Sequence, residues 1–266
     1  MLTSILLLLA FGCLSGFTTV LFGFGGGFVT VPVVYGVALA RSGGDAMHVA
    51  VATSTAVMVV NSATATATQL SSGRLRKEYV WPLVAFIGVG AVLGALAATV
   101  ADDSVLRVLF VVYLALTIVD SVLRKGFLQP GSAEQPRTLG KATSTAGGVG
   151  IGAVASFLGV GGSVMTVPLL RRKGLPMADA AAMANPLSLP VAVIGTAVYA
   201  FAATASGPAP AGQIGYVDLV AGAALLAGSL PTIAVARRVL GRLPDRVHAI
   251  TYVCLLAAAL IAVLAR

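Results

Sequence analysis

A ten-residue motif occurs twice in this chain, each time in the middle of a long uncharged apolar segment. The copies read GFGGGFVTVP (23–32) and GVGGSVMTVP (159–168), and six of the ten positions are identical at an offset of 136 residues. Such internal repetition indicates a chain built from two related halves. Inside a helix, glycine costs about 1 kcal/mol and proline about 3 kcal/mol relative to alanine. Each motif therefore predicts a break, after which a helix restarts at Phe28 or Val164.

The composition places the chain in a lipid bilayer. Hydrophobic residues make up 58% of the 266 residues and charged residues only 10%, too few to cover the surface of a soluble globule. A spanning helix needs about 20 apolar residues. We expect an all-α polytopic membrane protein with two homologous halves of four apolar segments each. The uncharged segments are Ile5–Ala40, Val49–Gly73, Tyr79–Ala101, Val108–Val119, Ala142–Leu170, Ala180–Val217, Leu219–Ala236 and Ala249–Ala265.

Basic residues predict how these segments are oriented. Of the 17 Lys and Arg residues, fourteen fall in four connections, which the positive-inside rule assigns to the cytoplasm. The connections around 41–45, 102–104 and 205–215 are then outside, and so are both termini. Because these basic residues serve to orient the protein in the membrane, the net charge of +8 does not call for nucleic acid as a partner. The fourteen residues are Arg74, Arg76, Lys77, Arg124, Lys125, Arg137, Lys141, Arg171, Arg172, Lys173, Arg237, Arg238, Arg242 and Arg246.

The segment Ala142–Leu170 carries cytoplasmic charge at both ends. Its 29 residues reach about 43 Å as helix, too short to cross a hydrocarbon core of about 30 Å twice. We predict a re-entrant hairpin turning at Gly159–Ser163, and a first-half hairpin that enters from outside and turns at Gly23–Gly27. The halves are then inverted repeats, as in many secondary transporters. The alternative is eight ordinary spans in parallel repeats.

Three regions follow from this division. Residues 1–124 form the first transmembrane repeat, residues 125–140 a cytoplasmic linker, and residues 141–266 the second repeat. The linker is recognised by its turn-forming residues, which include Pro130 and Pro136. The start of the chain lacks the basic residues of a signal peptide, so we expect the first segment to be retained.

The two breaks predict a binding cavity. Non-helical backbone at membrane depth occurs only where it is buried in protein or lines a watery cavity. A helix that restarts there exposes unpaired amide N–H groups and about half a unit of positive charge, which favours an anion. Thr30, Ser163 and Thr166 add hydroxyl donors. The competing interpretation is that the glycines only permit close helix packing.

The segment after each motif supplies uncharged polar side chains. Thr53 and Ser54 lie in the first half, and Asn185 and Ser188 lie in the second, with Thr53 and Asn185 expected at equivalent positions. A pocket formed by two helix starts and these side chains, without a carboxylate, suits a small oxyanion.

His48 is the candidate proton-coupling or gating residue, because histidine is the side chain that titrates near neutral pH. The competing interpretation is an interfacial histidine without such a role. Uniport, proton coupling through His48 and sodium coupling through backbone carbonyls all stay open. No His, Cys and Glu cluster indicates a metal, and no cofactor is expected.

Together these motifs resemble the sulfite exporter TauE/SafE family of membrane permeases, over essentially the whole chain. They are GFGGG…TVP followed by ATS (52–54), repeated as GVGGS…TVP followed by ANPLS (184–188), with a similar loop SGRL at 72–75. The resemblance implies a multi-pass transporter of the bacterial plasma membrane. Its substrates would be small sulfur-containing or organic anions, such as sulfite, sulfonates or thiosulfate, mostly exported. This chain departs from the family where Asn185-Pro186 replaces a second Thr-Ser.

The resemblance and the polar pattern give one set of substrate-binding candidates, which gathers the two glycine clusters and the polar residues that follow them. The set is Gly25, Gly26, Gly27, Thr53, Ser54, Gly161, Gly162, Ser163, Asn185 and Ser188.

The function expected is secondary transport of a small oxyanion by alternating access around a midplane site formed by the two breaks. An anion channel is one alternative. A membrane-embedded enzyme is another, but it needs a nucleophile and base at depth, and the sequence ending at Ser163 is not a GxSxG elbow. We therefore expect no enzyme. The expected partners are a small anionic substrate and the lipid bilayer, and the oligomeric state stays open.

Overall fold

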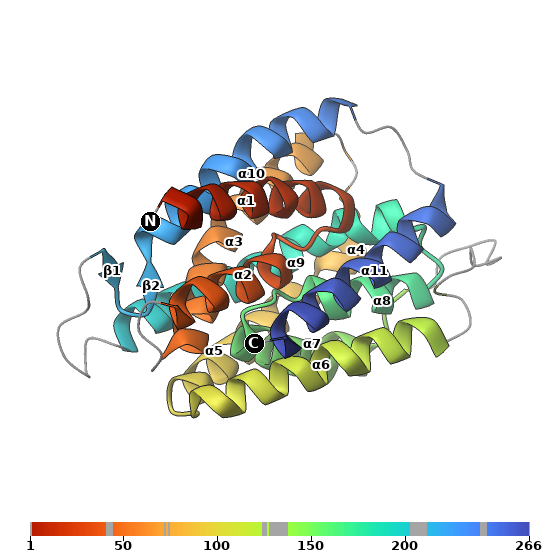
Figure 1. Ribbon diagram of the computed structural model, residues 1–266. Helices are drawn as coiled ribbons and strands as arrows, with labels where there is room; N and C mark the ends of the chain where they lie inside the picture. Colours follow the sequence, from red (N-terminus) through yellow and green to blue (C-terminus); the bar gives the residue numbers. More distant parts are fainter. Residues whose placement is uncertain are drawn as a thin grey trace.

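The computed structural model describes residues 2–40, 45–71, 73, 75–123, 127, 138–202, 212–239 and 244–265. It is a helical bundle, as Figure 1 shows, and the predicted all-α polytopic fold is confirmed. Among the described residues, seven helical stretches are long and apolar enough to cross a membrane. Most of the predicted linker 125–140 lies outside the described residues.

In the described part of the first half the structure has six helices. They are α1 (Leu2–Phe22), α2 (Gly27–Leu39), α3 (Ala46–Ser71), α4 (Lys77–Val80), α5 (Leu83–Thr99) and α6 (Asp103–Leu123).

The second half begins with a π-helical turn and contains one short antiparallel strand pair. Its elements are η1 (Thr143–Gly147), α7 (Gly148–Leu158), α8 (Ser163–Arg172), α9 (Met177–Ala202), β1 (Gln213–Ile214), β2 (Val217–Asp218), α10 (Leu219–Val239) and α11 (Asp245–Leu264).

Both predicted helix breaks are confirmed. In the first half one helix ends at Phe22 and the next begins at Gly27, and in the second half one ends at Leu158 and the next begins at Ser163. Each new helix begins one residue earlier than predicted. Left-handed backbone at Gly26 (φ 89°) and Gly161 (φ 73°) turns the chain, a conformation that favours glycine. The prolines of the motifs lie inside α2 and α8, so the glycines make the breaks.

The two hairpins differ in length. α1 has 21 residues and so reaches about 31 Å, enough for a complete crossing, whereas the 13 residues of α2 reach about 20 Å. In the second half, α7 and α8 have 11 and 10 residues. The first hairpin therefore joins a full-length helix to a short one, and the second joins two short helices.

Two other segments differ from their predicted bounds. α6 extends beyond Val108–Val119 at both ends, because charged residues such as Asp103 and Asp120 are accommodated in its end turns. Within the segment Ala180–Val217, α9 is described to Ala202, and Val217 belongs to the strand pair. α9 also continues as one helix through its two prolines.

Glycines bring the backbones of two helix pairs into contact. A Cβ on Gly16 of α1 would lie 2.4 Å from the Ser229 carbonyl oxygen of α10, and a Cβ on Gly152 of α7 would lie 2.0 Å from the Ile87 carbonyl oxygen of α5. Small residues at such crossings let membrane helices pack closely. The first hairpin is thus packed against α10 through α1, and the second against α5 through α7.

The basic connections meet at one end of the bundle. Arg76 lies 3.7 Å from Asp179, and Arg172 is paired with Asp120, so the ends of α3, α6, α8 and the start of α9 are close together, at the right of Figure 1. This is the grouping that the positive-inside pattern predicts. Five of the fourteen basic residues lie outside the described residues: Arg74, Arg124, Lys125, Arg137 and Arg242.

The connections without basic clusters meet at the opposite end. His48 at the start of α3 lies 3.2 Å from Asp103 at the start of α6, and its ring centroid is 5.1 Å from that of Tyr216. Arg107 donates a hydrogen bond to the Val263 carbonyl oxygen at 3.4 Å, so the end of α11 lies here as well.

We predict that Gly16→Leu and Gly152→Leu each destabilise the protein by about 1–3 kcal/mol or more, since a side chain there displaces backbone. The apparent melting temperature of purified protein in detergent measures this. The matched control is Gly150→Leu in α7, because a Cβ at Gly150 meets nothing within 4 Å. A melting temperature of Gly152→Leu equal to that of the control would contradict the close packing.

Candidate functional site

The two breaks meet at Ser54 of α3. Its Oγ lies 3.0 Å from the carbonyl oxygen of Gly27 and 2.9 Å from that of Gly159, and it accepts a hydrogen bond from Thr30 Oγ1 at 2.7 Å. Ser54 and Thr30 are fully buried. A hydroxyl has one proton and two lone pairs, so Ser54 donates to one break carbonyl at a time while accepting from Thr30. One side chain thus joins the breaks of both halves.

Met58, one turn further along α3, lies between the glycine clusters. A Cβ on Gly25 would lie 2.5 Å from Met58 Cγ, and one on Gly161 would lie 2.6 Å from Met58 Sδ and 3.3 Å from Ser188 Oγ. The structure therefore brings both predicted glycine clusters together with Ser54 and Ser188, across α3 and α9.

Asn61 holds the first break to neighbouring helices and was not among the predicted site residues. Its Nδ2 lies 3.3 Å from Ser15 Oγ and 3.3 Å from the Gly25 carbonyl oxygen, and its Oδ1 accepts from Ser229 Oγ at 2.8 Å. An amide with partners on both sides fixes the backbone of the break. The signal in the sequence was an amide in an apolar segment, two turns beyond Ser54.

At the second break, several buried polar groups lack a partner. Within the described residues, Ser163 Oγ, Thr166 Oγ1 and Asn185 Oδ1 make no hydrogen bond, and all three residues are fully buried. The Nδ2 of Asn185 lies 3.4 Å from the Thr19 carbonyl oxygen of α1. Ser188 Oγ donates to the Ala184 carbonyl oxygen of its own helix at 3.0 Å.

Thr53 lies away from the breaks. Its Oγ1 accepts a hydrogen bond from the backbone N–H of Asp218 at 2.9 Å, so it ties α3 to the strand pair and α10. The equivalence with Asn185 also differs from the expectation. Gly159 packs on Val51 of α3, and the equivalent glycine of the first half, Gly23, packs on Ala181 of α9. Val51 and Ala181 are 130 residues apart, so the same offset makes Thr55 rather than Thr53 the equivalent of Asn185.

His48 belongs to a clamp at the N-terminal end of α3. Asp103 Oδ1 accepts from the backbone N–H groups of Met47 at 2.7 Å and of His48 at 3.1 Å, and it lies 3.2 Å from His48 Nδ1. The other ring nitrogen, Nε2, lies 3.1 Å from the Ala98 carbonyl oxygen. Both ring nitrogens face acceptors, and only the imidazolium donates from both. The geometry therefore favours a charged His48.

An equivalent clamp holds the start of α9 at the other end of the bundle. Asp245 Oδ1 accepts from the backbone N–H of Met177 at 2.7 Å and from Arg171 Nη1 at 3.0 Å. Arginine stays charged at any physiological pH, whereas histidine titrates in that range. In both clamps an aspartate accepts the backbone N–H at the start of a helix, but the basic partner lies on the same helix in the first clamp and on α8 in the second.

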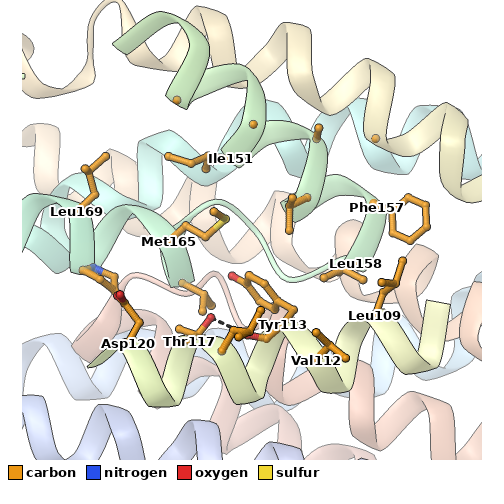
Figure 2. Close-up of a pocket in the computed structure, with 18 of the residues that line it drawn as sticks. Leu109, Val112, Tyr113, Thr117, Asp120, Ile151, Phe157, Leu158, Met165 and Leu169 are labelled. Carbon is orange, nitrogen blue, oxygen red and sulfur yellow. Dashed lines mark hydrogen bonds between the residues drawn. The ribbon is translucent and has the colours of Figure 1, made fainter. Parts of the chain in front are cut away.

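A separate groove of about 990 Å³ lies between α6, α7 and α8, as Figure 2 shows. Its walls are apolar, with Leu109 and Val112 on α6, and Met165 and Leu169 on α8; the Asp120–Arg172 ion pair closes one end. Ser163 and Thr166 are not among its lining residues. Tyr113 Oη, on these walls, has no hydrogen-bond partner in the described part of the chain, and the groove is separate from the donors at the breaks.

Among the described residues, no group of three or more His, Cys, Asp and Glu could hold a metal ion. The chemistry available at the breaks is therefore hydrogen bonding from hydroxyls and amide N–H groups. Donors of this kind are the groups that hold an anion at a helix start.

Comparison with known proteins finds a family that the chain matches. The family model described as "Sulfite exporter TauE/SafE" matches residues 8–263. No curated protein and no solved structure matches the chain.

Ser54→Ala should destabilise the protein by about 1–3 kcal/mol, because two buried carbonyl oxygens lose their shared donor. Thermal unfolding in detergent measures the change. Ser188→Ala is the matched control, since that serine is equally buried but bonds only its own helix and should change stability little. Equal melting temperatures for the two variants would show that Ser54 does not join the breaks.

Proposed function

Because the chain belongs to the sulfite exporter TauE/SafE family, we propose that it exports a small oxyanion, such as sulfite or a sulfonate, across the bacterial plasma membrane. The observation that carries this proposal is the meeting of two helix breaks at Ser54, with unpaired buried donors beside them. Membership of the family by itself implies a membrane transporter of sulfite or related anions. The candidate binding residues at the breaks are proposals on the same grounds.

We propose that the two halves are inverted repeats that alternate access to the site. The support is the direction of equivalent helices. α3 begins where Asp103 binds Met47, and α9 begins at the opposite end of the bundle, where Asp245 binds Met177. In inverted-repeat transporters one repeat rocks against the other around a midplane site made of broken helices. The breaks at Gly23–Gly27 and Gly159–Ser163 would occupy that position.

The orientation proposed for the protein puts its basic end in the cytoplasm. The described basic residues Arg76, Arg171 and Arg172 lie at that end, and the positive-inside rule assigns it to the cytoplasmic face. The start of α1 and the end of α11 lie toward the opposite end, so both termini would be outside. His48, at that outer end, is the proposed coupling or gating residue.

Gly162→Leu should reduce oxyanion flux at least about tenfold, since bulk beside the second break obstructs the bound anion. Gly162 has an ordinary φ of −67°, and a Cβ there would meet its nearest neighbour at 3.4 Å, so the variant should fold. Uptake of labelled sulfite into proteoliposomes measures the flux, with Gly150→Leu as the control for added bulk on the same hairpin. Wild-type flux in folded Gly162→Leu would refute a site at the breaks.

A further inference from the structure

We infer that the anion binds at the second break alone, on the first turn of α8, and that the first break is permanently closed by Ser54. This inference rests on the proposed function and deepens it, because it assigns the site to one of two related breaks. The contrast between equivalent residues carries it.

At the first break, the hydroxyl of the motif's threonine is paired with protein, whereas Ser62 Oγ of α3, 2.3 Å from where a Cβ on Gly25 would lie, has no partner among the described residues. Thr30 Oγ1 donates to Ser54, and Ser54 lies on the carbonyl oxygens of Gly27 and Gly159. The backbone N–H of Gly27 donates to the Phe24 carbonyl oxygen at 3.4 Å, and in the described residues only the N–H of Phe28 in this first turn has no partner. Among the described residues one fully buried hydroxyl, that of Ser62, is thus unpaired at the first break, against two on the first turn of α8.

The second break differs from the first in backbone and in side chains, since Gly26 has φ 89° and its equivalent Gly162 has φ −67°. The motif offset makes Thr166 the equivalent of Thr30, and the register of α3 and α9 makes Ala184 the equivalent of Ser54. A methyl group at position 184 donates and accepts nothing, so Thr166 Oγ1 has no counterpart to Ser54. Ser163 replaces Gly27 of the first motif and adds a second hydroxyl.

The first turn of α8 therefore gathers unpaired donors. Ser163 Oγ and Thr166 Oγ1 have no partner in the described part of the chain, and both residues are 0% exposed. They are three positions apart, so they lie on one face of the helix. The backbone N–H groups of Ser163 and Val164 are also unpaired within the described residues, whereas those of Met165 and Thr166 donate to Gly162.

Buried donors without partners are rare in folded proteins, and each is unfavourable unless something accepts its proton. The donors here are two hydroxyls and two amide N–H groups at the positive end of a helix, and none of these four groups carries a full positive charge. The ligand chemistry that they fit is an anion with at least two acceptor oxygens on one centre, such as sulfite or the head of a sulfonate.

The test compares equivalent substitutions in the two halves. Ser163→Ala/Thr166→Val removes the two unpaired hydroxyls, and Thr30→Val removes the paired threonine of the first half. Sulfite affinity is measured by calorimetry and by the rise in melting temperature that a ligand of the folded state produces. We expect the double variant to bind at least about tenfold more weakly than wild type, because it loses hydrogen bonds to a charged group.

Stability without anion provides a second readout. The double variant should melt at or above the wild-type temperature, because it loses unsatisfied donors, whereas Thr30→Val should melt lower and keep its affinity within about threefold. Ala184→Ser should weaken binding too, because it offers Thr166 the partner that Ser54 offers Thr30.

Each outcome decides between the two halves or rejects both. Equal losses of affinity in the double variant and Thr30→Val would overturn the assignment to the second break. Full affinity in the double variant would overturn it as well, and would show that water satisfies these hydroxyls. A folded wild type that neither binds nor transports any of sulfite, thiosulfate and sulfoacetate would instead refute the proposed function, and this inference with it.

Discussion

The hydrogen bonds of Ser54 hold together the two places where the helices of this protein are interrupted. Broken backbone inside a bilayer is tolerated only where it is buried in protein or lines a watery cavity, so its carbonyl and amide groups need partners there. Ser54 reaches the carbonyl oxygens of Gly27 and Gly159, one from each half. The left-handed glycines and the close contacts of α1 with α10 and of α7 with α5 hold the hairpins where one hydroxyl can serve both.

The same helices are fixed at their far ends by two carboxylates. Asp103 holds the start of α3, which carries Ser54, and Asp245 holds the start of α9, which carries Ala184. The charged partner is His48 in one clamp and Arg171 in the other. The histidine of the first clamp lies on the helix that joins the breaks, which is where a proton could influence the proposed rocking motion, while His248, near the second clamp, is bonded to the Leu21 carbonyl oxygen.

Much of the fold could be predicted because its signals are local. Glycine clusters predicted both breaks within one residue, and uncharged runs predicted the segments, although α6 with its charged end turns was placed too short. The correspondence between the residues of α3 and α9 could not be predicted in this way. Equivalent residues are 136 positions apart in the motifs but 130 apart in these helices, so Thr55 rather than Thr53 is the equivalent of Asn185. Nor could the sequence show that Ser54 would be engaged by backbone while Ser163 stays unpaired, since that depends on contacts across the halves.

The central claim is that the breaks form the site of a carrier, which opens to one side at a time. Counterflow tests it most directly: proteoliposomes preloaded with unlabelled sulfite are diluted into a trace of labelled sulfite at zero membrane potential. A carrier exchanges label inward while the internal pool lasts, so the account predicts a transient accumulation of label above its equilibrium level. Label that rises monotonically to equilibrium, at a rate proportional to concentration, would identify a channel and contradict alternating access.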